Sequence, residues 1–208
     1  MNSQQIKEIL LSEIHEVSIN YEKYCNDPKR DFSRKRKLPF ELMLKNIIGM
    51  GSKSITNELI DIFQASGEMP SASAFVQQRT KIRPEALKAV FDGFMSRILA
   101  SADKMRILAV DGSDIQIETN PKYKTSHIST SIDKKSFNLL HLNALYDLEE
   151  HVYTDAIIQA AKSQNEHGAL NEMVDRSEIP KALVIADRGY ESYNDMAHIQ
   201  EKGWFFLI

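Results

Sequence analysis

The first hundred residues carry apolar side chains at three- and four-residue intervals, which is the pattern of amphipathic helices. Pro39 and Pro84 fall where helices begin, a position at which the missing N–H group of proline costs nothing. Ser71 or Ser73 would cap a further short helix. The spacing therefore predicts an all-helical region, with helices at residues 3–24, 39–48, 55–63, 71–82 and 83–102.

Beyond residue 105 the apolar period shortens to two, or gives way to short runs rich in Ile, Val, Leu, Phe and Tyr, as in β-strands. The fold class that this order predicts is α/β: an N-terminal all-helical region, residues 1–100, followed by a mixed sheet with helical crossovers, residues 101–208. Residues 112–135 are polar beyond Ile117 and predict a long hairpin or loop. The strands are expected at 106–117, 137–148, 151–160, 182–187 and 204–208, and the helices between them at 167–176 and 191–203.

The composition is that of a folded globular protein, with 42% hydrophobic and 26% charged residues. No apolar run approaches the ~18 residues that a membrane helix needs, and charged side chains interrupt the N-terminal apolar positions, unlike in a secretory signal. The single cysteine, Cys25, excludes an internal disulfide and a Cys-rich zinc site. We therefore expect a cytoplasmic protein that makes no membrane contact and is held together by packing.

Charge is distributed unevenly along the chain. Residues 1–100 carry 15 basic and 12 acidic side chains, a net charge of +3, whereas residues 101–208 carry 11 and 17, a net charge of −6. A polyanion would suit the first part, and cations would suit the second. The densest positive charge is the segment KRDFSRKRK at 29–37, which would neutralise DNA phosphates unless it is only a solvated linker. Its candidate DNA contacts are Arg34, Lys35, Arg36 and Lys37.

The helix expected at 71–82 carries residue types that read base edges or bind phosphates from the major groove of DNA. These candidates are Gln77, Arg79 and Lys81. A plain solvated helix is the alternative that composition alone leaves open. Together with the basic segment at 29–37, this helix predicts a DNA-binding region within residues 1–100.

Two aspartates stand at the ends of expected apolar strands, Asp111 after RILAV and Asp187 after ALVIA. Carboxylates at strand ends of an open α/β sheet project into the crevice where such sheets bind ligands. Two like charges brought together there favour a divalent cation, and oxygen ligands favour Mg²⁺ or Mn²⁺. Taken singly, each aspartate is more often the cap of a turn or helix. Asp114 should point to the opposite sheet face from Asp111, and His141 should be an ordinary sheet histidine.

Three motifs, in this order, resemble the core of a DDE transposase of the insertion-sequence-four group: VDGSD around Asp111, HLNALYDL at 141–148 and IADRGYES around Asp187. The segments RKRKLPF and SAFVQQRTKI resemble the helical region that precedes the catalytic core in that group. The resemblance implies a ribonuclease-H-like core in which Asp111 and Asp187 are the first two members of a metal-binding catalytic triad. It also implies magnesium or manganese as cofactor.

The resemblance further implies double-stranded DNA, the terminal inverted repeats of a mobile element, as the partner, an assembly of at least two chains, and a bacterial, nucleoid-associated location. The third triad member of the group is a Glu in a Tyr-Arg-Glu-Lys-like motif, and no Glu of this sequence matches it. We therefore expect a chain truncated before its third catalytic acid. Arg188 would meet a phosphate and Tyr190 would stack on a DNA base, unless Gly189 merely holds a turn with Tyr190 packed.

The sequence thus predicts a DNA transposase that cleaves and transfers strands by two-metal-ion phosphodiester chemistry, here catalytically incomplete. A non-catalytic DNA-binding relic or regulator of the element is the alternative. An ordinary α/β ligand-binding domain ranks last, because the sequence has no Gly-rich phosphate loop of the Walker or Rossmann kind.

Overall fold

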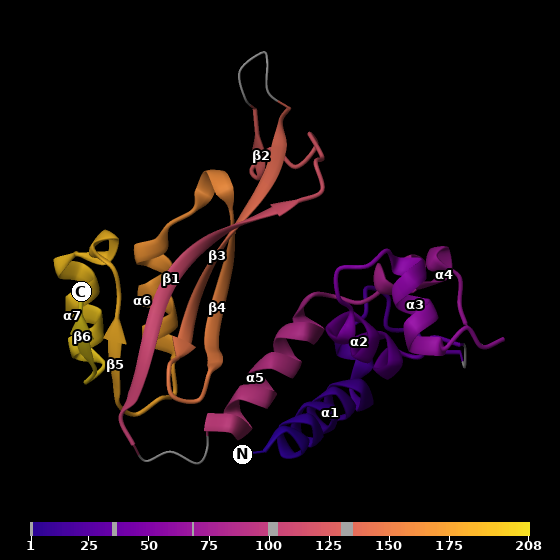
Figure 1. The fold of residues 1–208 in the computed structure, drawn as a ribbon, viewed down its shortest axis with the longest axis horizontal. Coiled ribbons are helices and arrows are strands. Elements are labelled where there is room, and N and C mark those ends of the chain that lie inside the picture. Colours follow the sequence, from indigo (N-terminus) through magenta and orange to yellow (C-terminus); the bar gives the residue numbers. More distant parts are fainter. Residues whose placement is uncertain (1, 35–36, 68, 100–103, 130–134) are drawn as a thin grey trace. The chain divides into compact units, whose positions relative to one another are not determined.

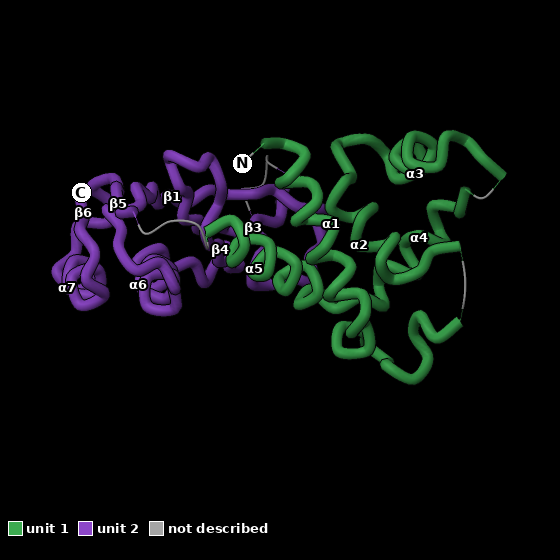
Figure 2. The backbone as a smooth tube through the Cα atoms, turned by 90° about the horizontal axis from the view of Figure 1, so that it is seen from below, with its two compact units in different colours: residues 1–101 green, residues 102–208 purple. Residues whose placement is uncertain are grey.

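The computed structural model describes residues 2–34, 37–67, 69–99, 104–129 and 135–208. The chain divides into two compact units, residues 1–101 and residues 102–208 (Figure 2). The first is helical and the second is built on a mixed sheet, so the predicted fold class is confirmed. Within the described residues, no helix combines the length and the apolar character that crossing a membrane would need.

The first unit consists of short helices with side-chain caps at several of their N-termini. Asn2 and Gln5 form a reciprocal capping box at the first helix, and Ser54 and Ser71 cap the helices that follow them. The predicted helix at 3–24 ends early at Asn20, after which the chain makes a 3₁₀ turn. The elements are α1 (Ser3–Ile19), η1 (Tyr21–Tyr24), α2 (Phe40–Gly49), α3 (Ile55–Phe63), α4 (Ala72–Arg79) and α5 (Glu85–Leu99).

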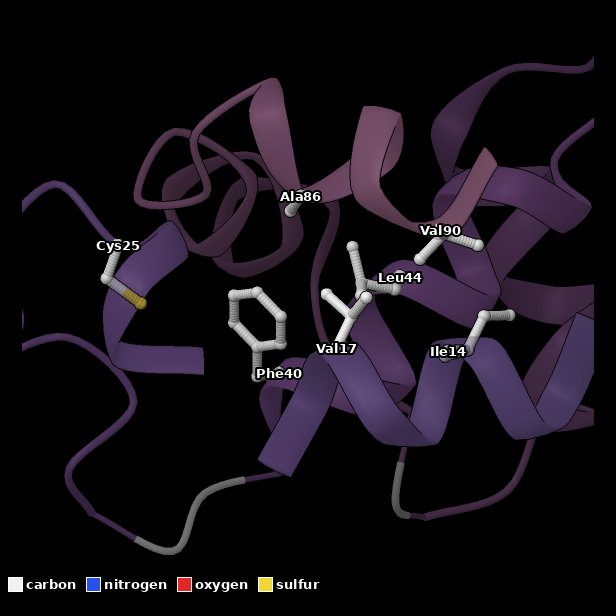
Figure 3. Packing of buried hydrophobic residues seen from close by; sticks show 7 residues of the cluster. All are labelled: Ile14, Val17, Cys25, Phe40, Leu44, Ala86 and Val90. Carbon is white, nitrogen blue, oxygen red and sulfur yellow. The ribbon is translucent and has the colours of Figure 1, made fainter. Parts of the chain in front are cut away.

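Two hydrophobic clusters hold this unit together. The first joins α1, α2 and α5 (Figure 3), and its buried members are Ile14, Val17, Cys25, Phe40, Leu44, Ala86 and Val90. The second joins α2, α3 and α4 through Leu38, Met43, Leu59 and Phe75. Burial raises the pKa of the Cys25 thiol to about 11, so this lone cysteine is an inert packing residue.

The second unit is a mixed sheet. Strand β3 is antiparallel to both of its long neighbours, β1 and β4, whereas β5 is parallel to its neighbours β1 and β6 (Figure 1). Helix α6 leads from β4 into β5, and α7 leads from β5 into β6. The strand order is β2-β3-β1-β5-β6, with β4 also paired to β3. The strands are β1 (Arg106–Ile117), β2 (His127–Ile128), β3 (Phe137–Asp147), β4 (Val152–Ala160), β5 (Ala182–Ile185) and β6 (Phe205–Leu207). The helical elements are η2 (Ala161–Ser163), α6 (Glu166–Arg176), η3 (Arg188–Tyr190) and α7 (Tyr193–Glu201).

The long-hairpin alternative for the polar stretch after Gly112 is the one observed. β1 and β3 pair continuously from Leu108↔Asp147 to Ile117↔Asn138. Asn138 is fully buried, and its side chain accepts a hydrogen bond from the Asn120 N–H group at 2.9 Å and donates one to the Ser126 hydroxyl at 2.8 Å. A single amide of β3 thus holds Asn120 and Ser126, two described residues of the segment that follows β1.

The two faces of this sheet differ in what covers them. Helices α6 and α7 lie on the same side of the strands (Figure 2), and on that side Leu108, Val110 and Val184 are buried. The opposite side carries Phe205 and Leu207, which are 53% and 60% exposed. Because side chains alternate along a strand, this second side also carries the odd-numbered residues of β1 and is called the open face below.

Candidate functional site

Asp111 lies in the middle of β1, and Asp187 lies two residues beyond the carboxyl end of the neighbouring strand β5. The parallel ladder between these strands ends at the pair Ala109↔Ile185, and each aspartate comes two residues later. A step of two returns the side chain to the same face, and neighbouring strands are about 4.8 Å apart. The register therefore places both residues at one level of the open face. Asp187 follows the end of its strand as predicted, whereas Asp111 does not end a strand, because β1 continues in its pairing with β3 to Ile117.

Both aspartates are exposed, and each uses one oxygen for a local hydrogen bond. Asp111 Oδ1 accepts from the Gly112 N–H group at 2.9 Å, and Asp187 Oδ1 accepts from the Gly189 N–H group at 2.7 Å. The second bond caps the 3₁₀ turn η3, so the capping alternative for Asp187 is also realised. Capping occupies only one oxygen of the carboxylate and leaves Oδ2 for a ligand.

Asp114 lies on the other face of β1, as strand pleating predicted. It pairs with His141 of β3, whose Nδ1 lies 2.9 Å from Asp114 Oδ1. The other ring nitrogen lies 2.9 Å from Glu166 Oε1 at the start of α6, although its direction does not make a hydrogen bond. His141 is a buried sheet histidine held between two carboxylates, and it lies on the helix-covered face, away from the side chain of Asp111.

Tyr190 is buried, and the structure corrects the expectation that it stacks on a DNA base. Its side chain is 2% exposed, and its ring packs against His167 with 6.0 Å between centroids. Burial raises the pKa of the phenol strongly, and the negative charges of Glu166 and Asp111 raise it further. A ring enclosed in this way has no free face for a base. Arg188 is exposed beside Asp187 and remains available to a phosphate.

One cluster beside Tyr190 was not expected from the sequence. Asp195 of α7 is fully buried and bonds His167 Nδ1 and the Asn171 amide, the latter at 3.1 Å. Together with the pair His141–Glu166, this cluster fastens the first turn of α6 to its neighbours on both sides. Asp195 stands on a polar-looking helix, so the sequence alone gave no signal that it would be buried.

Two of the candidate DNA-binding residues of the first unit, Arg34 and Lys81, line one pocket. Arg34 and Arg79 are exposed, and Lys81 is half-buried beside the segment that contains Arg34. Lys37 donates to the Gly67 carbonyl oxygen at 2.9 Å, and Gln77 donates to the Ser73 hydroxyl at 3.1 Å. The two remaining candidates, Lys35 and Arg36, lie outside the described residues.

The carboxylates at 111 and 187 fit a hard divalent ion in chemistry but do not by themselves complete a site. Their exposed oxygens are the ligands that Mg²⁺ and Mn²⁺ prefer. In the part of the chain that the structure describes, no group of three or more His, Cys, Asp or Glu side chains is placed to hold a metal. Glu166 does not supply the third ligand, because it approaches Gly112 from the helix-covered face.

Residues 102–208 match the family described as the transposase DDE domain. The chain belongs to this family. The matched residues are the second unit of the structure and contain both Asp111 and Asp187. No curated protein matches the sequence.

Two solved structures show a distant likeness to this DDE-domain protein. One is a cryo-EM structure of a piggyBac transposase synaptic complex with hairpin DNA: the identity is 11%, the TM-score is 0.47, and the match covers 99% of this chain and 48% of that chain. The other is the Drosophila P element transposase strand transfer complex, at 11% identity and a TM-score of 0.36, covering 96% of this chain and 42% of that chain. The DDE-domain protein thus spans less than half the length of either.

Proposed function

We propose that this chain is a DNA transposase of the insertion-sequence-four group whose ribonuclease-H-like core binds a divalent metal ion between Asp111 and Asp187. The observation that carries the proposal is the register of β1 and β5, which aligns these two carboxylates on the open face. Membership in the DDE family supports the same assignment. The motifs VDGSD and IADRGYES support the narrower group.

In this proposal each residue of the site has a separate task. Asp111, from within β1, and Asp187, just beyond β5, hold the ion with their exposed carboxylate oxygens. A divalent ion bound there supplies Lewis-acid polarisation of a DNA phosphodiester and activation of the attacking oxygen. Arg188 binds the phosphate next to the scissile bond, because its exposed guanidinium follows Asp187 directly. Tyr190 sits behind the turn as a packing residue that fixes the position of Asp187.

Strand cleavage needs a further carboxylate in this proposal. Two carboxylates provide only part of the oxygen shell of a divalent ion, and the described residues place no third acidic side chain with them. We therefore propose that the 208 residues bind metal weakly and cleave DNA poorly. Appending a C-terminal segment that carries the Glu of the group is expected to restore nicking of plasmid DNA in Mg²⁺ or Mn²⁺, and Asp187→Asn is expected to abolish it again.

Metal binding tests the site without requiring cleavage. Titration with Mn²⁺, followed by electron paramagnetic resonance of the free ion, is expected to reveal one weak site that Asp111→Asn and Asp187→Asn each remove. Asp114→Asn is the matched control, since Asp114 lies three residues along the same strand but on the opposite face. Equal loss of Mn²⁺ in the Asp114 variant would show that the binding is diffuse, and the assignment would fail.

A binding protein without cleavage is the second candidate. Two observations favour it. Among the described residues no third acidic side chain joins Asp111 and Asp187, and basic side chains gather around one pocket of the first unit. Such a protein would occupy the terminal inverted repeats of the element and regulate it. Sequence-selective, salt-sensitive binding with no metal-dependent nicking, even after addition of the Glu segment, would decide for this candidate.

A further inference from the structure

The basic segment of the first unit begins as a compact, ordered loop. The Asp31 N–H group donates to the Asp27 carbonyl oxygen at 2.8 Å, and the Asp31 carboxylate accepts from the Asp27 N–H group at 2.9 Å. Phe32 adopts a left-handed backbone, φ 56°, which is costly for an aromatic residue. This conformation is maintained by its ring, which packs edge-on against Phe40 with 5.2 Å between centroids. The loop is therefore anchored in the core rather than free in solvent.

The same loop is fastened to the end of α4. The Asn26 N–H group donates to the Lys81 carbonyl oxygen at 3.0 Å, and the Asn26 side-chain amide donates to the Thr80 carbonyl oxygen at 2.7 Å. Cys25 and Ile82 form a β-bridge next to these bonds. The loop that opens the basic segment at 29–37 is thus held by hydrogen bonds to the end of the helix predicted at 71–82.

Between them lies a pocket of about 520 Å³, called the basic pocket below. Four cations line it, and none of them makes an ion pair with any described residue: Lys29, Arg30, Arg34 and Lys81. Elsewhere in this unit cations do pair, as Lys45 does with Glu41, Lys53 with Asp61 and Lys88 with Asp92. Lys7, Lys23 and Arg79 also make no ion pair with a described residue, so what distinguishes this pocket is that four such cations line it together.

Two aspartates also line the basic pocket but do not cancel its charge. Asp27 Oδ1 accepts from the Lys29 N–H group at 3.2 Å, and Asp31 Oδ2 is used within the loop as described. These carboxylates shape the backbone of the loop. Four cations against two anions leave a net positive lining.

A buried amide of α4 lines the same pocket. Gln78 is 8% exposed, and its Oε1 has no hydrogen-bond partner among the described residues. A buried polar atom without a partner costs on the order of 1–3 kcal/mol, and a ligand that gives this carboxamide a hydrogen-bond partner would remove the cost. Rotation of the carboxamide exchanges the oxygen for the NH₂ group, which donates to an anion. Its neighbour Gln77 is exposed, donates to Ser73 and does not line the pocket, so only Gln78 is placed to bind a ligand there.

We propose that the basic pocket binds a phosphodiester group of the DNA backbone, with Gln78 donating to a phosphate oxygen and the four cations neutralising it. This inference rests on the proposed function, since it names the site through which a DNA-binding chain would hold the duplex. Preformed loop, unpaired cations and an unpartnered buried amide together distinguish it from a diffuse basic surface. The residue that marks it is Gln78 rather than Gln77.

The salt dependence of DNA binding separates the ionic contacts of the four cations from the hydrogen bond of Gln78. Affinity of the full 208-residue chain for a 20-base-pair duplex of mixed sequence is measured by fluorescence anisotropy across a range of KCl concentrations. Lys81→Met is expected to weaken binding and to reduce the slope of log K against log salt by about 0.9, because one cation–phosphate contact is lost. Gln78→Leu is expected to weaken binding about tenfold with an unchanged slope, because the lost contact is a hydrogen bond from a neutral group.

Matched controls are Gln4→Leu, an exposed glutamine of α1 that donates to Glu8, and Lys88→Met, a cation already paired with Asp92. Both are expected to leave the affinity within about twofold, which is the scale of a surface substitution. Gln78→Glu keeps the shape of the side chain and introduces a negative charge, so it should weaken binding more than Gln78→Leu. Circular dichroism melting checks that each variant is folded.

The outcomes separate this inference from the proposed function. If the unmodified chain does not bind DNA at low salt, the proposed function fails. If it binds but Gln78→Leu behaves like Gln4→Leu, only the basic pocket inference is overturned. Inorganic phosphate is the remaining probe, and its binding is followed by the NMR shifts of the Gln78 side-chain amide. If these shifts saturate with phosphate while Gln78→Leu leaves the DNA affinity unchanged, the pocket is a site for free phosphate. That result would also overturn the inference that the pocket binds the DNA backbone.

Discussion

Strand β1 carries charged side chains in opposite circumstances at its start and in its middle. At its start, Arg106 is 1% exposed and donates to the fully buried Asp147 at 2.7 Å. At the carboxyl end of its pairing with β5, Asp111 is exposed and shares the open face with another carboxylate, Asp187. Charges withdrawn from water must be paired, whereas like charges side by side persist only where water or a cation can reach them. The pair Arg106–Asp147 therefore maintains the fold, and the pair Asp111 and Asp187 is the one to which we assign the proposed metal site.

The largest expected effect comes from breaking the buried pair. Arg106→Met leaves the Asp147 carboxylate buried without its cation, and we expect the free energy of unfolding to fall by about 3–5 kcal/mol. Urea unfolding followed by circular dichroism measures it. The double variant Arg106→Met/Asp147→Leu should recover much of the loss, because it removes the uncompensated charge. A single variant as stable as the unmodified chain would show that the pair contributes nothing.

Acid should act on the same pair. Burial by itself raises the pKa of Asp147, but hydrogen bonds from the Glu150 N–H group, from Arg106 and from the Glu149 N–H group outweigh it and hold the pKa below its ordinary value. The carboxylate therefore contributes stability above the unfolded-state pKa of about 3.9, and this contribution is lost as the pH falls through the lower folded value. Urea unfolding at a series of acidic pH values should show a shallower decline for Arg106→Met/Asp147→Leu than for the unmodified chain.

A substitution next to Asp111 should have an intermediate effect. A Cβ at Gly112 would lie 2.6 Å from His141 Nε2 and from Glu166 Oε1. The glutamate can move aside, but the buried imidazole cannot, so Gly112→Ala is expected to destabilise the chain by about 1–3 kcal/mol. Gly49→Ala is the control, since a Cβ there meets nothing within 4 Å. Equal unfolding midpoints for the two variants would contradict the close packing of His141.

The smallest effect on stability is expected at the exposed pair. Asp187→Asn keeps the oxygen that accepts from Gly189 and removes the repulsion by Asp111, so the free energy of unfolding should stay constant or rise by less than about 1 kcal/mol. Urea unfolding in the presence of a chelator measures this free energy. If Asp187→Asn lost as much stability as Arg106→Met, the contrast between the buried pair and the exposed pair would be overturned.

Part of this molecule could be predicted from local sequence pattern. The helical and strand periods predicted the two regions and the order of the strands and crossover helices. That Asp111 and Asp187 act together in one site stays a prediction. The alternation of side chains along a strand also predicted that Asp114 lies on the face of β1 opposite to that of Asp111. These predictions depend only on the spacing of neighbouring residues, which is the same in any protein that contains the pattern.

Other features of the site depend on contacts between distant segments. Tyr190 was left open between stacking and packing, and its burial follows from the position of α6 above the turn. Asp195 reads as a surface residue until α7 packs on α6. Gln77 and Gln78 are equivalent in composition, and only the loop that ends at Arg34 distinguishes them.

The sequence by itself determined which residues could carry chemistry and which elements hold them, because periodicity and residue type are local. Only the tertiary structure decided that Asp111 and Asp187 stand at one level, that Arg106 is buried with Asp147, and that Gln78 is enclosed without a partner. The reason is physical: register, burial and hydrogen-bond partners are set by segments far apart in the chain, and free energies of pairing and desolvation arise only when those segments meet.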